Sequence, residues 1–304
     1  MNNPLNRPLG FGQILDQTFS ITKQHFLNFF LIILILSGPF YLLQAVVELL
    51  YGAAFFRSVE LGTNWLDDLV TSFDATSPSG SVAAELWSGG IELISYLFLP
   101  IAQASILLAI FTLRQGEQYS VGSVLKKAFS RFWPIVGCSL LFFLIMLGLF
   151  MVPFFLIMIL TLAFSFIHPA IGVVIAIFLS IPCFFGVFYF YIRWGFYFGS
   201  VVIDRISPGL GRSWNLTKKR TWTLMGIYFL LFIIVLLTMS GVELVFGAFL
   251  GNSVLFQLIL NVVEMIAWVI YSVAFAVMFF DLKARYDADD LKELIESYDT
   301  LKSN

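Results

Sequence analysis

The chain has 304 residues, of which 60% are hydrophobic and only 12% are charged, and its mean hydropathy is +0.92. Ordinary soluble domains carry about 25% charged residues, so this composition excludes a soluble globular protein. The net charge of −2 argues against a nucleic-acid partner, because the basic residues are not gathered into one groove-binding cluster.

The Lys and Arg residues are unevenly distributed along the chain. Fifteen of the 17 fall in four short segments, and long uncharged stretches separate these segments. Because cytoplasmic loops of membrane proteins are enriched in Lys and Arg, this pattern predicts six spans with both termini in the cytoplasm. The four segments are the N-terminus with Arg7 and Lys23, residues 114–131, residues 203–221 and the tail from Lys283 onward.

The sequence therefore predicts an all-α polytopic integral membrane protein, with six transmembrane helices in three hairpins that form one membrane domain. Helices are expected because unpaired backbone amides are too costly in hydrocarbon, and the uniformly apolar runs lack the alternation of a β-barrel. The predicted segments are a cytoplasmic interfacial helix (1–25), a first span (26–51), an external acidic loop (52–90), a second span (91–113), a cytoplasmic segment (114–131), a third span (132–164), a fourth span (170–200), a cytoplasmic basic loop (201–221), a fifth span (222–247), a sixth span (254–280) and a cytoplasmic tail (281–304).

Amphipathic segments outside the spans predict further helices. Within the external loop, residues 57–73 carry an apolar stripe, and in the tail residues 288–302 carry another, with Asp287 placed as its N-cap. A short segment with an aromatic residue near its end precedes each hairpin, and we interpret these segments as interfacial helices on the inner leaflet. They are residues 12–19, 122–129 and 209–214.

Small residues in the third and fourth spans suggest where helices approach closely. Glycines allow backbones in a membrane to pack together. The two cysteines, Cys138 and Cys183, are expected to be small buried hydrophobic residues rather than a disulfide. The glycines expected at close contacts are Gly137, Gly148, Gly172 and Gly186.

Glu264 is the one charge-capable residue placed well inside a predicted span, about ten residues into the sixth helix and so ~15 Å deep. An ionised carboxylate there is costly, so we expect it to be protonated, paired or hydrated. A neutral Glu264 bonded to an amide would hold helices together, whereas a polar cavity open to the outside would accept a proton, a cation or a headgroup. The candidate intramembrane polar cluster is Glu264, Asn261, Gln257, Gln103 and Gln44.

Basic residues at the predicted inner edge are candidates for contacts with anionic lipid headgroups. A cation near the cytoplasmic leaflet contributes about 1 kcal/mol to such binding, and a long side chain at the end of a span reaches the headgroups by snorkelling. The candidates are Arg193, Arg212, Lys218, Lys219 and Arg220.

Residue patterns of the common enzymes do not occur in the sequence. It contains no Walker loop, nucleotide fingerprint, Gly-x-Ser-x-Gly motif, or Cys or His pair at zinc spacing. The two histidines, His25 and His168, are expected on opposite faces of the membrane. We therefore expect no catalytic, cofactor-binding or metal-binding residue, and no cofactor.

Two short motifs resemble those of a bacterial membrane family. The first is RPLGFGQILDQTF at residues 7–19, and the second is VIDR at 202–205, followed by Ser207-Pro208, RSWNLTK at 212–218 and Trp222. They are similar to the membrane domain fused to some glycerophosphoryl diester phosphodiesterases, which also occurs as stand-alone polytopic proteins. The resemblance implies a protein of the bacterial cytoplasmic membrane. It does not imply phosphodiesterase activity, because no His-Arg-Gly or Glu-Asn signature accompanies either histidine.

Two functions of different classes are compatible with these features. The first is a non-enzymatic membrane protein that organises lipid or partner proteins, with anionic headgroups at the cytoplasmic face and a membrane protein as its partners. The alternative is a transporter, or a membrane subunit of one, for a lipid-like or small cationic solute, with an ATPase from another chain as its partner. An intramembrane enzyme has the least support.

Overall fold

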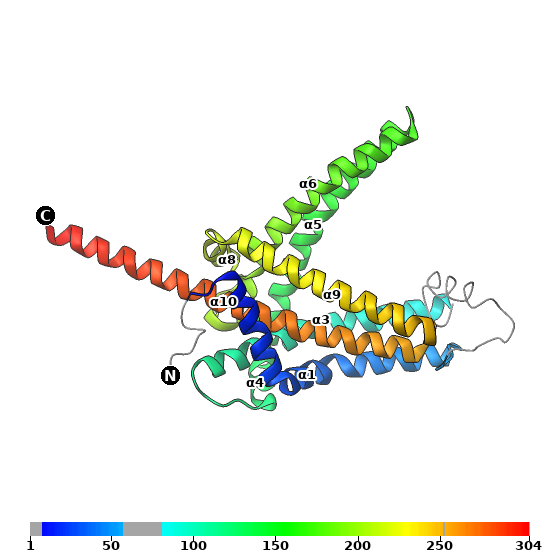
Figure 1. Cartoon of the computed structure of the whole chain (residues 1–304), viewed down its shortest axis with the longest axis horizontal. Helices are drawn as coiled ribbons and strands as arrows, with labels where there is room; N and C mark the ends of the chain where they lie inside the picture. Colours follow the sequence, from blue (N-terminus) through cyan, green and yellow to red (C-terminus); the bar gives the residue numbers. More distant parts are fainter. Residues whose placement is uncertain (1–7, 57–80, 252, 304) are drawn as a thin grey trace. The chain divides into compact units, whose positions relative to one another are not determined.

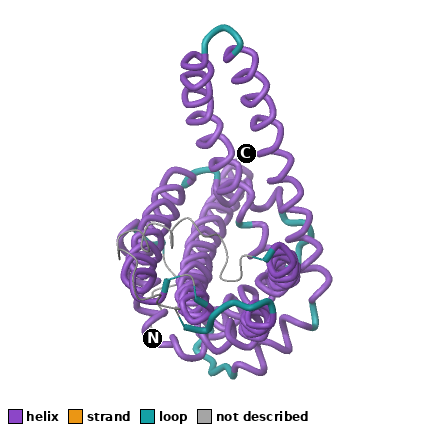
Figure 2. Tube along the Cα trace, turned by 90° about the vertical axis from the view of Figure 1, so that its right-hand side faces the viewer, coloured by secondary structure: helices purple, strands orange, loops and turns teal. Residues whose placement is uncertain are grey.

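The structure is a computed structural model that describes residues 8–56, 81–251 and 253–303. Within these ranges the chain folds into helices and forms no strand (Figure 1, Figure 2). Six of the helical segments described are long and apolar enough to cross a membrane. The predicted all-α polytopic fold is therefore confirmed.

The described part of the chain forms two compact units. The residues of unit 1 fall within 1–11, 131–227 and 278–304, and those of unit 2 fall within 12–130 and 228–277. The sequence predicts one membrane domain. The division into units arises from contacts between distant segments, which the hydropathy of single segments does not reveal.

Unit 2 contains most of helix α1 (Phe11–Leu50), helix α3 (Val82–Arg114) and helix α4 (Val121–Phe129). Helix α1 is broken at His25, whose φ of −119° and ψ of 19° are not helical, and this break lies at the predicted end of the interfacial helix. The short helix α4 starts at a capping box, in which the Ser120 and Ser123 side chains each accept a bond from the other's backbone N–H.

Helix α3 begins earlier than the sequence predicts. Residues 82–90, which were assigned to the external loop, form its first turns. Glu85 lies in the first turn, where a negative charge is favourable at the positive end of the helix dipole. The amphipathic helix predicted at 57–73 lies outside the described residues.

Unit 1 contains a long antiparallel hairpin of helix α5 (Phe132–Ser165) and helix α6 (Pro169–Gly195), which run side by side in both views (Figure 1, Figure 2). The turn between them is set by His168, whose Nδ1 accepts a hydrogen bond from the backbone of Ala170 at 3.2 Å. Pro169 follows at the first helical position, where its missing N–H costs nothing.

Only one of the four glycines expected at close helix contacts is tightly packed. An added Cβ at Gly172 would lie 2.8 Å from the carbonyl oxygen of Thr161, so a side chain there would clash with α5. An added Cβ at Gly137, Gly148 or Gly186 would meet no atom within 4 Å, and the prediction is wrong for these three. The hairpin is closed near its turn and more open further away.

The segment after α6 is largely ordered. The short helix α7 (Tyr197–Gly199) lies within the predicted fourth span, and a π-helical turn η2 (Ser200–Asp204) leads into the predicted basic loop. That loop contains helix α8 (Leu210–Thr217). Gly209 precedes α8 with a φ of 70°, and an added Cβ there would lie 3.0 Å from the carbonyl oxygen of Tyr197. A glycine is therefore needed for the chain to turn into α8.

Helix α9 (Thr221–Leu250) and helix α10 (Val254–Ser303) complete the chain and contribute to both units. Helix α10 is continuous, so Asp287 lies inside it and the prediction of an N-cap at Asp287 is wrong. The reason is local, because α10 contains neither proline nor glycine and nothing stops the helix after the span. The side chains of the predicted tail seam lie outside the described part of the chain.

Candidate functional site

The carboxylate of Glu264 in α10 receives a hydrogen-bond donor on each oxygen. The Tyr41 hydroxyl of α1 donates to Oε2 at 3.2 Å, and the Trp268 indole donates to Oε1 at 3.3 Å. Tyr41 is buried and Glu264 is half-buried, and all three residues belong to unit 2. Trp268 follows Glu264 by four residues, so both occupy one face of the helix.

The amides of the predicted cluster make other contacts. Gln257 donates to Oδ1 of the buried Asn261 at 3.3 Å, and Gln44 donates to the backbone oxygen of Ser88 at 3.2 Å. Gln103 is half-buried in α3, and in the described part of the chain no hydrogen bond joins it to the others. An amide partner for Glu264 is one of the two alternatives that the sequence leaves open, and in the structure its hydrogen bonds come from Tyr41 and Trp268 instead.

Two further carboxylates of unit 2 were not included in the predicted cluster. Glu48 of α1 is only 8% exposed, and among the described residues its Oε2 has no hydrogen-bond partner. Glu92 of α3 accepts a hydrogen bond from the Tyr96 hydroxyl at 2.8 Å. Glutamates on two helices besides α10 therefore give this unit acidic groups that can hold a proton or a cation.

Glu264 is expected to act in folding mainly as a hydrogen-bond acceptor. In a Glu264→Gln variant the amide oxygen still accepts from Tyr41 or Trp268, so we expect the free energy of unfolding to change little. Glu264→Leu leaves both donors without a partner and is expected to lower the free energy of unfolding by about 1 to 3 kcal/mol. Chemical unfolding of the full chain in detergent measures both values.

A double-mutant cycle with Tyr41→Phe serves as the control. The Leu variant should destabilise less in that background, because one of the donors is already gone. If Gln destabilises as much as Leu, the charge of Glu264 is required and the hydrogen-bonding account is contradicted. If Gln is stable but alters the phenotype of cells that depend on the protein, the ionisable group itself has a functional role.

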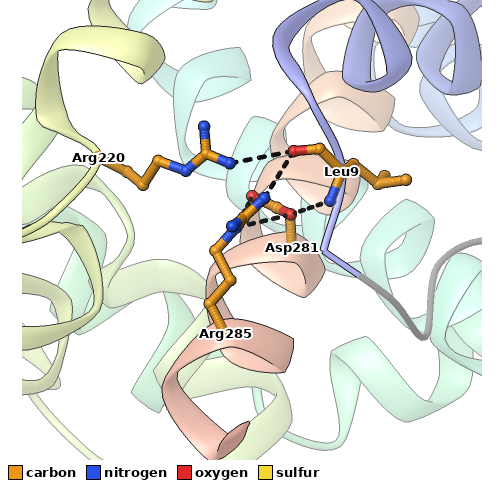
Figure 3. Close-up of polar contacts among 4 residues, drawn as sticks. All are labelled: Leu9, Arg220, Asp281 and Arg285. Atoms are coloured by element: carbon orange, nitrogen blue, oxygen red, sulfur yellow. Dashed lines mark hydrogen bonds and ion pairs between the residues drawn. The ribbon is translucent and has the colours of Figure 1, made fainter. Parts of the chain in front are cut away.

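In unit 1 the backbone of Leu9 is held by charged groups that come from two other segments (Figure 3). Asp281 accepts a hydrogen bond from the Leu9 amide at 2.6 Å, and Arg285 donates to both oxygens of Asp281 at 3.1 Å. Arg285 and Arg220 also donate to the Leu9 carbonyl oxygen, at 2.7 Å and 3.2 Å. Asp281 is only 3% exposed, so this cluster fixes the N-terminal segment firmly to α10.

A second buried carboxylate of unit 1 belongs to Asp204, at the end of the π-helical turn. Arg212 of α8 forms an ion pair with it at 2.7 Å, and Lys283 of α10 forms another. The guanidinium of Arg212 also lies 5.9 Å from the ring of Tyr286. Asp204 thus connects α8 and α10 within the unit.

Arg193 is buried, with 3% of its surface exposed, and it packs against α8. Its guanidinium lies 3.8 Å from the ring centre of Trp214 and donates to the Thr217 hydroxyl at 3.3 Å. The Ser213 hydroxyl donates to the Arg193 carbonyl oxygen at 2.8 Å. These contacts make Arg193 part of the packing between α6 and α8.

The five headgroup candidates differ in their exposure. Arg193 is buried, Arg212 and Arg220 are half-buried, and Lys218 and Lys219 are exposed at the end of α8. Lipid contact stays a prediction for all five, and the two lysines are the best placed for it. The protein partners of the three arginines come from other segments, so they could not be predicted from the sequence.

Among the side chains that the structure describes in residues 8–56, 81–251 and 253–303, no group of three or more His, Cys, Asp or Glu residues could hold a metal ion. Comparison with protein-family models, curated proteins and solved structures finds no match for the chain. The clusters around Glu264, Asp281 and Asp204 are therefore interpreted from their own chemistry.

Proposed function

We propose that the chain is a non-enzymatic protein of the bacterial cytoplasmic membrane that organises lipid or partner membrane proteins. The observation that supports this best is the exposure of the α5–α6 hairpin. In the most apolar 18-residue stretch of α5, no residue is buried. In the most apolar 18-residue stretch of residues 169–204, only 6% of the residues are buried. An apolar surface of this extent needs a cover, which lipid or another membrane protein supplies.

The basic residues support lipid as one of the ligands. Lys218 and Lys219 are exposed at the end of α8, which belongs to unit 1 together with the hairpin. Each ammonium near an anionic leaflet contributes about 1 kcal/mol to lipid binding. The resemblance of residues 7–19 and 202–222 to a bacterial membrane-domain family supports the proposed location. We place both termini in the cytoplasm on the distribution of Lys and Arg alone.

The proposal is tested by extracting the full chain from bacterial membranes in polymer discs without detergent. We expect anionic phospholipid in the discs above its fraction in the bulk membrane, or a co-purified membrane protein. Lys218→Gln combined with Lys219→Gln should reduce retention of anionic lipid by roughly tenfold to thirtyfold, because two cationic contacts are removed. Native mass spectrometry measures the bound lipid.

The matched control replaces both lysines with arginine, which keeps the charge and should keep the lipid. Arg212 and Arg220 remain unchanged in these variants, because they contact Asp204 and Leu9 and their loss would disturb folding. A chain that elutes alone with bulk lipid, and whose deletion alters no membrane property, would contradict the proposal.

Transport of a lipid-like or small cationic solute is the second candidate function. It is favoured by the half-buried Glu264 with its two donors, and by Pro39 and Pro100 inside α1 and α3 of the same unit. Proline-interrupted spans can line a cavity in transporters. Uptake of cations and lipid-like solutes into proteoliposomes tests this function, and an absence of flux across a broad panel of solutes would count against it.

A further inference from the structure

An open apolar groove runs between α5 and α6, entirely within unit 1. Its volume is about 560 Å³. Residues between Leu144 and Pro153 line it from α5, and residues between Cys183 and Trp194 line it from α6. At 1.5 Å per residue these stretches cover roughly 14 to 17 Å along the helices.

The groove exists because a glycine faces it from each helix. Gly148 and Gly186 both line it, and an added Cβ at either position would meet no atom within 4 Å. Larger side chains at these positions would occupy the hollow. The two glycines therefore leave space for a ligand, whereas Gly172 near the turn brings the helices together.

The lining of the groove favours a flexible apolar occupant. The residues that line it are apolar, glycine or cysteine, and the groove is open on one side. In a bilayer a hydrocarbon chain is the neighbour always at hand to fill an apolar hollow, and its flexibility lets it follow the walls.

One end of the groove is lined by a tryptophan that packs against α8, the helix followed by Lys218. Trp194 lines this end, and its ring centre lies 6.0 Å from that of Trp214 in α8. Tryptophan is enriched at headgroup level in membrane proteins. Lys218 is exposed, follows Trp214 by four residues and still has helical dihedral angles, so it lies on the same side of α8. The apolar groove and the nearby ammonium complement a ligand with an apolar chain and an anionic head.

We propose that the α5–α6 groove binds an acyl chain of an anionic phospholipid, whose phosphate pairs with Lys218. This inference rests on the proposed function and names its ligand and site. Gly148 and Gly186 shape the groove, Trp194 marks its headgroup end, and Lys218 selects the charge of the lipid.

The test uses the full chain in nanodiscs that contain phosphatidylglycerol with a photoreactive diazirine in one acyl chain. After illumination, peptide mass spectrometry should place the crosslinks mainly within residues 144–153 and 183–194. Gly186→Leu fills the groove and should reduce these crosslinks at least about fivefold. Gly148→Leu should act in the same way from the opposite wall and guards against a folding defect in one variant.

The control is Gly137→Leu on α5, which is also in open space but does not line the groove. It should leave the crosslinks unchanged. Lys218→Gln, or a phosphatidylcholine probe with the same chain, should reduce the crosslinks about fivefold, because one cationic contact is lost. Thermal unfolding confirms that each variant is folded before it is labelled.

Crosslinks spread evenly over α5 and α6, or unchanged in folded Gly148→Leu and Gly186→Leu variants, would overturn the site. Equal labelling by the two headgroups would overturn the role of Lys218. If groove labelling fails while lipid retention still depends on Lys218 and Lys219, the groove is wrong and the proposed function stands. If the discs hold only bulk lipid, the proposed function itself fails.

Discussion

Replacing Asp204 with Asn is expected to lower the free energy of unfolding by about 3 to 5 kcal/mol. Asp204 has a side chain that is only 8% exposed, and it pairs with Arg212 and Lys283. Asn keeps the shape of the side chain but removes its charge. Arg212 and Lys283 then both lack a counter-ion beside the buried side chain. The loss of free energy is larger than for the loss of an exposed ion pair.

Denaturant unfolding of the full chain in detergent measures this effect. Arg212→Gln and Lys283→Gln should each destabilise less than Asp204→Asn, because Asp204 keeps one partner in either variant. The matched control is Glu117→Gln, which neutralises an exposed carboxylate and should change the free energy by less than about 0.5 kcal/mol. An Asp204→Asn variant within 1 kcal/mol of the unmodified chain would show that the two ion pairs do not stabilise unit 1.

The spans could be predicted from the sequence because the length of an apolar run is a local property. The third span was expected at residues 132–164, and α5 covers Phe132–Ser165. The sixth was expected to begin at residue 254, where α10 begins. The predicted tail helix at residues 288–302 is helical, but it is continuous with the sixth span in α10. The separate start at Asp287 was wrong because an apolar run stops where the membrane stops, whereas a helix continues until its backbone is interrupted.

The helix contacts could not be predicted from residue type alone. A glycine allows a close approach, but the geometry of the neighbouring helix decides whether the approach occurs. Gly172 is beside the turn, where α5 and α6 are held together, and it is tightly packed. Gly148 and Gly186 lie where the helices have separated, and they line a groove instead.

The partners of the candidate site residues also depend on which segments the fold brings together. Trp268 could have been recognised, because it lies one helical turn after Glu264 in the sequence. Tyr41 is 223 residues away from Glu264 and has no local signal. Arg193 occupies the end of a span, which favours snorkelling, but α8 folds over it and supplies Trp214 and Thr217 as partners.

Membrane sidedness is the second large effect, because the expected outcome is all-or-none. Fifteen Lys and Arg residues lie in segments predicted inside, whereas the predicted outer loops contain only Arg57. A cytoplasmic position also brings Lys218 to the leaflet that is richer in anionic lipid, as the proposed function requires.

A reporter enzyme that is active only outside the cytoplasm tests this orientation most directly. It is fused after Asn304 in one strain and inserted near Ser79, in the predicted external loop, in another. We expect no activity from the Asn304 fusion and strong activity from the Ser79 insertion, with equal amounts of both proteins in the membrane. Strong activity from the Asn304 fusion would place the C-terminus outside and contradict the account.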